Sequence, residues 1–327
     1  MTAPQRVGII GTFVWDTIYG RGGSNVPTEE WGGIAYSLSA LDAALSPDWQ
    51  IVPLIKVGSD LADRARGFCR TLEHIAPDAA LIEVAQPNNR VELVYETSER
   101  RAEKLTGGVA GWSWLGLKPL LAGLDALYIN FLSGWELDLE TAQLLRQHFK
   151  GPIYCDLHML VMAVQPEGWR ALRPLPNVAE WCRCFDVLQM NEDEVTAAAP
   201  DGLALAATAL ANGVRALLVT LGPRGAVYFA APGFDRLADL SRAPQIGRGA
   251  AGNGPIRTER IAVAAQSQEG DPTGCGDVWG ATCFSRLLQG DSLREAIDAA
   301  HRAAARNVAH RGATGLARHL RGEIISR

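Results

Sequence analysis

The segment from Asp271 to Gly290, DPTGCGDVWGATCFSRLLQG, places two glycines and an acid directly before apolar residues at helical spacing. We predict a helix that begins near Gly276, because Val278, Phe284 and their apolar neighbours fall on one helical face. Glycines at a helix start leave the first backbone N–H groups uncovered, and these donors with the helix dipole attract an anion such as a phosphoryl group. Asp277 is then either a base beside that anion or a residue that only complements the dipole.

Cys275 in the same segment offers a different chemistry. A thiol at a helix N-terminus has a lowered pKa and becomes a nucleophile. A cysteine hydrolase also needs a positioned base, for which His158 and His301 are the candidates, although no local feature marks either one. A small buried cysteine is the more common explanation of such a residue.

Two nucleotide-binding motifs are excluded. The letters GRGAAG at 247–252 match the dinucleotide fingerprint, but Pro255 follows where that motif requires a helix, so the match is accidental. The sequence contains no G-x-x-x-x-G-K-[ST] loop, which excludes a P-loop of the usual kind.

Buried strands and helices are predicted to alternate along most of the chain. The strand-like apolar runs lie at 7–11, 51–58, 125–132, 152–156, 185–191 and 214–222, and the helical patterns lie at 33–45, 60–75, 139–149, 192–199 and 203–213. Such alternation predicts a parallel sheet that helices cover on both faces.

Two segments depart from this alternation. Residues 89–108 alternate at period two around a turn-like TSER, which predicts a β-hairpin that serves as a lid over a site, as a dimer surface or as a solvent-facing decoration. Residues 232–258 are rich in Gly, Pro and Arg and are predicted to form a long surface loop.

The composition restricts the class of protein. The chain has 327 residues, a length that one α/β domain accommodates, and its net charge of -5 argues against a nucleic acid or a membrane surface as the main partner. Six scattered cysteines fit neither a disulfide framework nor a C-x2-C zinc site. We find no signal peptide and no apolar run of membrane-spanning length, so we expect a cytoplasmic location.

Several segments together resemble the ribokinase-like, or PfkB, family of carbohydrate kinases over nearly the whole chain. DPTGCGDVWGA is similar to the family's D-T-x-G-A-G-D signature, QMNEDEV to its N-x-x-E element, VTLGPRGA to its T-x-G-x-x-G element and WGGIAYSLSAL to its N-terminal di-glycine, in the same order. The resemblance implies one domain over residues 1–327, with a three-layer α/β/α fold, a mainly parallel sheet and a small β-sheet lid from about 12–31 and 86–108.

The resemblance implies that Asp277 is a general base. It would accept the proton of a substrate hydroxyl that attacks the γ-phosphoryl group of ATP, while the N–H groups of Gly274, Cys275 and Gly276 hold the developing charge. An aspartate with a pKa of about 4 takes such a proton late, when the oxygen is already bonding to phosphorus. Most of the catalysis is then electrostatic and positional.

Other residues acquire roles on the donor side by the same resemblance. Asn191 and Glu194 would arrange the hydration shell of Mg²⁺, although the residues alone predict only a capping box at a helix start. The residues that would bind nucleotide are Asn191, Thr220, Gly222, Gly225 and His301, and those of a possible monovalent cation site, such as one for K⁺, are Asp271 and Thr273 with the loop from Arg311.

On the acceptor side, the resemblance assigns substrate hydroxyls to Asp16 and to the backbone at Gly32 and Gly33. The sequence departs from the ribokinase pattern at Ser37, where the family has Asn, and at 155–158, where CDLH replaces a D-x-N element. Trp15, Tyr19, Trp31, Tyr36 and Tyr95 lie nearby in the sequence and could stack on a sugar or on a nucleoside base.

These features predict an ATP-dependent kinase of a hydroxymethyl group on a small sugar or sugar acid. A nucleoside kinase of the same family, a non-catalytic ligand-binding member and the cysteine hydrolase are the alternatives. Relatives in the family often dimerise through the lid, so RVELVYET at 90–97 is a candidate edge for a homodimer.

Overall fold

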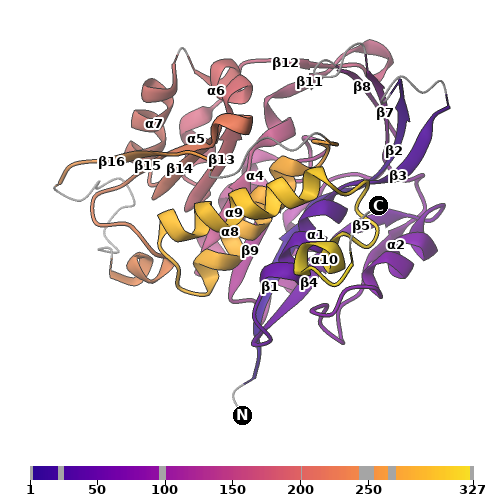
Figure 1. The fold of residues 1–327 in the computed structure, drawn as a ribbon, viewed down its shortest axis with the longest axis horizontal. Coiled ribbons are helices and arrows are strands. Elements are labelled where there is room, and N and C mark those ends of the chain that lie inside the picture. Colours follow the sequence, from indigo (N-terminus) through magenta and orange to yellow (C-terminus); the bar gives the residue numbers. More distant parts are fainter. Residues whose placement is uncertain are drawn as a thin grey trace.

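The computed structural model describes residues 3–20, 26–95, 101–199, 201–242, 254–263 and 270–324. Within these ranges eight strands form the main sheet in the order β16-β15-β14-β13-β10-β9-β1-β4 (Figure 1). The strands are β1 Gln5–Ile10, β4 Trp49–Leu54, β9 Ala126–Asn130, β10 Ile153–Asp156, β13 Val187–Asn191, β14 Ala216–Thr220, β15 Ala226–Ala230 and β16 Arg257–Ile261. Neighbours from β4 to β14 run parallel, and β15 and β16 are antiparallel.

Two groups of helices cover this sheet. The helices are α1 Ile34–Ala44, α2 Ala62–Cys69, α3 Trp114–Leu117, α4 Leu139–His148, α5 Val178–Cys182, α6 Glu192–Ala198, α7 Gly202–Ala211, α8 Cys275–Leu288, α9 Leu293–Val308 and α10 Leu316–Arg321. Helices α1, α8, α9 and α10 pack together on one side, and α4 to α7 form the other group (Figure 1). The predicted three-layer α/β fold with a mainly parallel sheet is confirmed.

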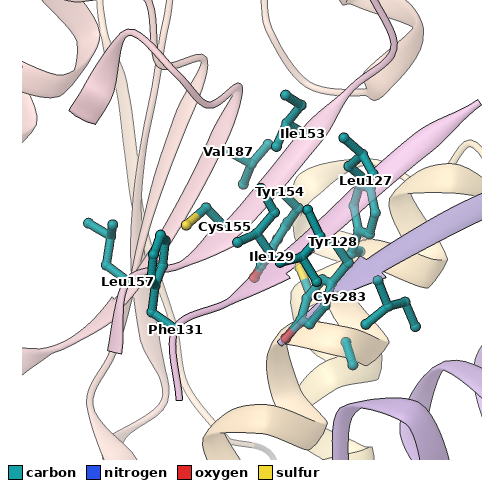
Figure 2. Packing of buried hydrophobic residues seen from close by; sticks show 14 of the residues in the cluster. Leu127, Tyr128, Ile129, Phe131, Ile153, Tyr154, Cys155, Leu157, Val187 and Cys283 are labelled. Carbon is teal, nitrogen blue, oxygen red and sulfur yellow. The ribbon is translucent and has the colours of Figure 1, made fainter. Parts of the chain in front are cut away.

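The core lies on both faces of the central strands. Every residue of β9 is buried, as expected of a parallel strand between two helical layers. Figure 2 shows the packing of β9, β10 and Cys283 of α8, in which the rings of Tyr128 and Tyr154 stack with centroids 5.5 Å apart. Phe284 of α8 contacts Tyr154 with a centroid distance of 5.2 Å, so α8 is part of the core as well as of the site.

Two of the predicted elements differ in extent. The run at 51–58 divides into β4 and β5 (Lys56–Gly58), and β5 pairs with β6 (Ile82–Val84) in a separate small sheet. The helix predicted at 60–75 ends at Cys69, because the chain from His74 onward pairs with the open edge of β4 instead. The Ile51 N–H donates to the His74 carbonyl at 2.7 Å, and the Ala76 N–H donates to the Ile51 carbonyl at 2.9 Å.

A second, four-stranded sheet with the order β3-β2-β7-β8 comes from the segments predicted to form the lid. Its strands are β2 Phe13–Tyr19, β3 Thr28–Gly33, β7 Arg90–Tyr95 and β8 Arg101–Thr106. β7 and β8 are antiparallel as the predicted hairpin requires, although its turn at 96–100 lies outside the described residues. β7 lies between β2 and β8, so the prediction that it offers a free edge for a dimer is wrong.

A two-stranded ribbon that the sequence did not predict pairs with the outer edge of β8. Strands β11 (Met162–Val164) and β12 (Arg170–Leu172) form this antiparallel ribbon next to the second sheet (Figure 1). Lys104 of β8 makes an antiparallel bridge with Trp169, and the Gly168 backbone comes so close to the Leu105 carbonyl that a Cβ would lie 2.4 Å from its oxygen. The ribbon therefore covers the edge of the lid sheet.

The predicted loop at 232–258 is partly regular. A 3₁₀ segment spans Leu237–Arg242, and β16 begins at Arg257 because it completes the edge of the main sheet by pairing with β15. Residues 243–253, which include GRGAAG, lie outside the described residues. In the described part of the chain, the helices are too short or too polar to cross a membrane.

Alanine substitutions at two glycines of α8 should differ in their effect on stability. A Cβ on Gly280 would lie 2.0 Å from Gln189 Oε1 and 3.0 Å from the Tyr128 hydroxyl, so Gly280→Ala should lower the free energy of unfolding by about 1–3 kcal/mol despite the better helix propensity of Ala. A Cβ on Gly276 meets no atom within 4 Å, so Gly276→Ala should change stability by less than about 1 kcal/mol. Urea unfolding of both variants measures this difference, and equal losses would contradict the packing described here.

Candidate active site

Polar side chains end a row of neighbouring parallel strands. Asn130 ends β9, Asp156 ends β10, Asn191 ends β13 and Thr220 ends β14. The register places Asp156 opposite Asn130, and Asn191 opposite Thr220, so all four lie along one edge of the sheet. Ligands of open α/β sheets bind beyond this carboxyl edge.

Helix α8 begins directly over this edge. Its N-cap, Gly274, has a left-handed φ of 73°, and a Cβ there would lie 2.2 Å from the ring of Tyr36, so glycine is required on both counts. The Gln189 amide nitrogen donates to the Gly276 carbonyl at 3.1 Å and to the Asp156 carboxylate at 2.9 Å. Gln189 thus fixes the first turn of α8 to β13 and β10.

Asp277 is held by a buried amide. Asn130 Nδ2 donates to Asp277 Oδ1 at 2.6 Å and to the Ser37 hydroxyl at 3.2 Å, and the Asn130 side chain is fully buried. Ser37, one of the departures from the ribokinase pattern, therefore belongs to the network that orients the predicted base. A carboxylate held by a fixed donor has a defined direction for its second oxygen.

The predicted anion site is smaller than the sequence indicated. The Cys275 N–H donates to the Pro272 carbonyl at 3.1 Å, which closes a turn, so this donor is already used here and its part in holding an anion stays a prediction. The N–H groups of Gly274 and Gly276 have no acceptor among the described residues. These two donors remain at the positive end of α8.

The thiol of Cys275 faces α9. It accepts from Asn307 Nδ2 at 3.3 Å and lies 3.5 Å from the Ala304 carbonyl. Burial raises the pKa of Cys275 to about 11, and the hydrogen bond from Asn307 offsets only part of this effect. A nucleophilic thiol requires a lowered pKa, so the geometry argues against the cysteine hydrolase.

An acidic cluster with one histidine lies beside Asp277. His158 Nδ1 lies 2.9 Å from Glu194 Oε1. Burial lowers the pKa of His158, but the hydrogen bond and charge of Glu194, with the nearby Asp156 and Asp277, outweigh this and raise it to about 10. Burial also raises the pKa of Asp156 well above its usual range, and the charge of His158 offsets only part of that rise. The imidazolium therefore supplies positive charge beside three carboxyl groups.

The capping box predicted at Asn191 and Glu194 is present. The Glu194 N–H donates to Asn191 Oδ1, while the Asn191 N–H and Nδ2 donate to the Glu194 carboxylate. A carboxylate offers about four acceptor positions, and these two donors with His158 occupy three of them. One acceptor position of Glu194 therefore remains open, and its contact with a Mg²⁺-bound water stays a prediction.

The predicted nucleotide-binding residues differ in how open their surroundings are to a ligand. Gly222 has a φ of 56° with no atom within 4 Å of a would-be Cβ, so its backbone is open to a ligand. Gly225 has a φ of 97° and packs on the Ile261 carbonyl, which explains the glycine without a nucleotide. Thr220 Oγ1 lies 3.5 Å from the Met190 carbonyl.

His301 is buried and uses both ring nitrogens. Its Nδ1 accepts from the Trp279 indole at 3.0 Å, and its Nε2 lies 3.2 Å from the Ile261 carbonyl. Burial lowers the pKa of His301, which matches a neutral ring that donates from Nε2 and accepts at Nδ1. A hydrogen bond from His301 to a nucleotide base would require one of these contacts to break.

Asp271 and Thr273 form a local turn. The Thr273 N–H donates to Asp271 Oδ1 at 3.0 Å, and the Thr273 carbonyl accepts from Asn307 at 2.9 Å. Within the described ranges no three His, Cys, Asp or Glu residues converge on a metal position. A monovalent cation here would depend on backbone carbonyls.

A pocket between α8 and the lid sheet brings the two ends of the predicted site together. Asp16, Gly33, Thr273, Gly274 and Asp277 all line it. Asp16 comes from β2, and a Cβ on its neighbour Gly32 would lie 1.8 Å from Asp16 Oδ2. Glycine is thus required at position 32 to leave room for the Asp16 carboxylate, to which the sequence analysis assigned substrate hydroxyls. Asp16 and Asp277 share one cavity.

Comparison with known proteins places this geometry in a family. Residues 158–319 match the model of the pfkB family carbohydrate kinases. The chain belongs to the pfkB family of carbohydrate kinases. Members of this family are phosphotransferases, and the matched residues include the donor-side motifs and Asp277 but not Asp16. No curated protein sequence matches the chain.

Solved structures of ribokinase-family kinases share the fold of this pfkB-family chain. A pyrophosphate-dependent kinase of the ribokinase family has a TM-score of 0.73 at 15% identity, with 98% of this chain and 100% of that chain covered. The nucleoside kinase of Methanocaldococcus jannaschii has 0.66 at 14%, with 98% and 100% covered. The ribokinase of Arabidopsis thaliana, complexed with ribose and ATP, has 0.66 at 15%, with 98% of each covered.

Three polar residues of the site were not predicted from the sequence of this pfkB-family protein. Asn130 had a signal, since it is a polar residue at the end of a buried strand. Arg170 and Glu103 line the same pocket as Asp277, from β12 and β8. Neither of these two lies near a recognisable motif, and only the pairing of the ribbon with the lid sheet brings them together.

The Cys275 thiol should react slowly in the folded protein. With a pKa of about 11 in place of the usual 9.0, its thiolate fraction at pH 8 is about a hundredfold smaller, and burial slows alkylation further. Iodoacetamide labelling at pH 8, located by mass spectrometry, measures the rate, with the urea-unfolded chain as control. Labelling of Cys275 in the folded chain at a rate equal to or above its rate in the unfolded chain would contradict this and revive the thiol mechanism.

Proposed function

We propose that this protein transfers the γ-phosphoryl group of ATP to a hydroxymethyl group of a small sugar-like acceptor. The observation that carries the proposal is the position of Asp277, which lies in the first turn of α8, is oriented by Asn130 and shares a pocket with Asp16. On this proposal the base, the anion site and the hydroxyl-binding carboxylate lie around one cavity. The match to the family supports the reaction class.

In the proposed mechanism Asp16 binds acceptor hydroxyls and Asp277 faces the reacting one. The acceptor oxygen forms its bond to phosphorus as the bond from phosphorus to the leaving phosphate oxygen breaks, and Asp277 takes the hydroxyl proton late in that step. The N–H groups of Gly274 and Gly276 and the dipole of α8 stabilise the charge on the phosphoryl oxygens. His158, positively charged at neutral pH, adds to that stabilisation.

Binding of the phosphoryl donor is assigned to residues of the sequence motifs. Bound Mg²⁺ would neutralise phosphate charge, with Glu194 contacting it through water. Asn191, Thr220 and the open backbone at Gly222 would line the phosphates or the nucleotide. Asp271 and Thr273 stay a prediction for a monovalent cation. One of the similar structures is pyrophosphate-dependent, so pyrophosphate belongs beside ATP in any donor assay.

Two alternatives receive less support. A nucleoside acceptor would need an aromatic platform for its base, and in the described part of the pocket lining Tyr36 is the sole aromatic side chain other than His158. A non-catalytic ligand-binding member would not need a base held at 2.6 Å by a buried amide. Kinase activity toward a sugar is the function that this geometry favours.

Replacement of Asp277 by Asn should lower kcat by at least about a hundredfold, on the scale of positioned acid–base groups. The isosteric amide keeps the packing of α8 but cannot take the proton. Coupled assays of phosphoryl transfer, with ATP and separately with pyrophosphate as donor, measure the loss against the wild-type protein.

Cys275→Ala is the matched control in the same turn. It keeps the backbone and removes only a buried thiol, so kcat should stay within about threefold of the wild-type value, with a modest loss of stability from the missing Asn307 contact. Near-normal turnover of Asp277→Asn would refute the assignment of the base, and loss of turnover in Cys275→Ala alone would point to thiol chemistry.

A further inference from the structure

A buried ion pair lines the acceptor pocket and belongs to no motif of the sequence. Arg170 Nη1 of β12 lies 3.3 Å from Glu103 Oε2 of β8. The two side chains are 3% and 12% exposed, so the pair is almost completely removed from solvent. Both residues line the cavity that also contains Asp16 and Asp277. Buried charges are costly unless they are well paired, so a pair in a ligand cavity invites a functional explanation.

The guanidinium of Arg170 is held from two sides and still has an unused donor. Its Nη2 donates to the Leu132 carbonyl at 2.8 Å, which fixes the side chain against the loop after β9. Its Nε is buried, and it has no hydrogen-bond partner in the part of the chain that the structure describes. A guanidinium has five N–H donors, so after the bonds to Glu103 and Leu132 the Arg170 side chain still has donors for a ligand in the pocket.

A neutral hydroxyl matches this pair better than an anionic group does. A hydroxyl both donates and accepts, so one hydroxyl of a ligand can accept from Arg170 while its neighbour donates to Glu103. A carboxylate only accepts, and in this pocket the three acidic side chains of Asp16, Glu103 and Asp277 outnumber the two cations, His158 and Arg170. Since Glu103 already neutralises Arg170, a second carboxylate would have to displace it.

The two tryptophans that the sequence offered for stacking on a base pack elsewhere. Trp31 packs edge-on against Trp15 with centroids 5.0 Å apart and lies 5.1 Å from Phe13. Trp15 also carries the guanidinium of Arg64 over its ring, at 4.9 Å from the centroid. In the pocket itself, Tyr36 is the one aromatic side chain of the described apolar wall, and the rest is aliphatic or thioether, from Val14, Val91, Leu93, Leu132 and Met159. Such a wall suits the C–H face of a saturated ring.

We propose that Arg170 and Glu103 are specificity-determining residues that bind neighbouring hydroxyls of the acceptor, and that the acceptor is a neutral sugar or cyclic polyol and not a sugar acid or a nucleoside. This inference rests on the proposed kinase function, because it concerns the acceptor of that same site. Arg170 and Glu103 touch the hydroxyls that do not react, while Asp277 serves the one that does.

The test is the acceptor selectivity of the wild-type protein and of two variants. With ATP or pyrophosphate as donor, kcat/KM is measured for neutral sugars and cyclitols, for the matching sugar acids and for nucleosides. The wild-type protein should prefer a neutral polyol by about tenfold or more over the best sugar acid and the best nucleoside. Glu103→Gln removes the repelling charge with little change of shape, so the ratio of sugar-acid to neutral-polyol kcat/KM should rise about tenfold.

Arg170→Gln should lower kcat/KM for the neutral acceptor about tenfold or more, mainly through KM, because it removes the charged donors. Arg90→Gln is the control, since Arg90 lies on β7 of the same lid sheet and pairs with Asp60 at the surface, outside the pocket lining. It should leave every acceptor ratio unchanged. Circular dichroism and urea unfolding show whether each variant is folded.

The possible outcomes distinguish the inference about the acceptor from the proposed kinase function. A wild-type protein that prefers a sugar acid or a nucleoside would overturn this inference and leave the kinase function standing. Unchanged acceptor ratios in folded Glu103→Gln would overturn it as well. Wild-type protein that phosphorylates no member of the three classes with either donor would contradict the kinase function itself. If either variant fails to fold, the acceptor ranking of the wild-type protein still decides.

Discussion

The site depends on how the first turn of α8 is fixed to the ends of β9, β10 and β13. Two side-chain amides do this: Gln189 joins the Gly276 carbonyl to Asp156, and Asn130 orients Asp277. Neutral amides are suited to the task because they bridge carboxylates and backbone carbonyls without adding charge to a buried region. Close contact at Gly280 lets the helix come near enough for both bonds to form.

Charge balance is the second constraint. Asp156, Glu194 and Asp277 converge at the carboxyl edge of the sheet, and burial makes their joint ionisation costly. His158 lies among them with a pKa raised to about 10, and the pKa of Asp156 is raised well above its usual range. Burial thus favours the neutral form of Asp156, and the His158 imidazolium brings a positive charge to the same edge of the sheet.

Local sequence patterns predicted the parts of the site that are made by local structure. The turn before α8, the position of Asp277 and the capping box at Asn191 follow from residues within a few positions of one another, and the alternating pattern predicted the main sheet. The use of the Cys275 N–H by Pro272 was missed, because it depends on the exact shape of that turn. Arg170 and Glu103 were missed because they meet only through long-range strand pairing, which no short window contains.

The pairing of Trp15 in β2 with Arg90 in β7 has a consequence for how the chain acquires its pocket. Between these residues lie α1, β4 and α2, so the lid sheet joins segments that are far apart in the sequence, and its closure carries the entropy cost of a long loop. The ribbon at 162–172 and then α8 come later in the chain, and the proposed acceptor site needs residues from both. During synthesis, therefore, the acceptor cannot be bound tightly by a partial chain, and a polyol ligand would stabilise only molecules whose long-range topology is already complete.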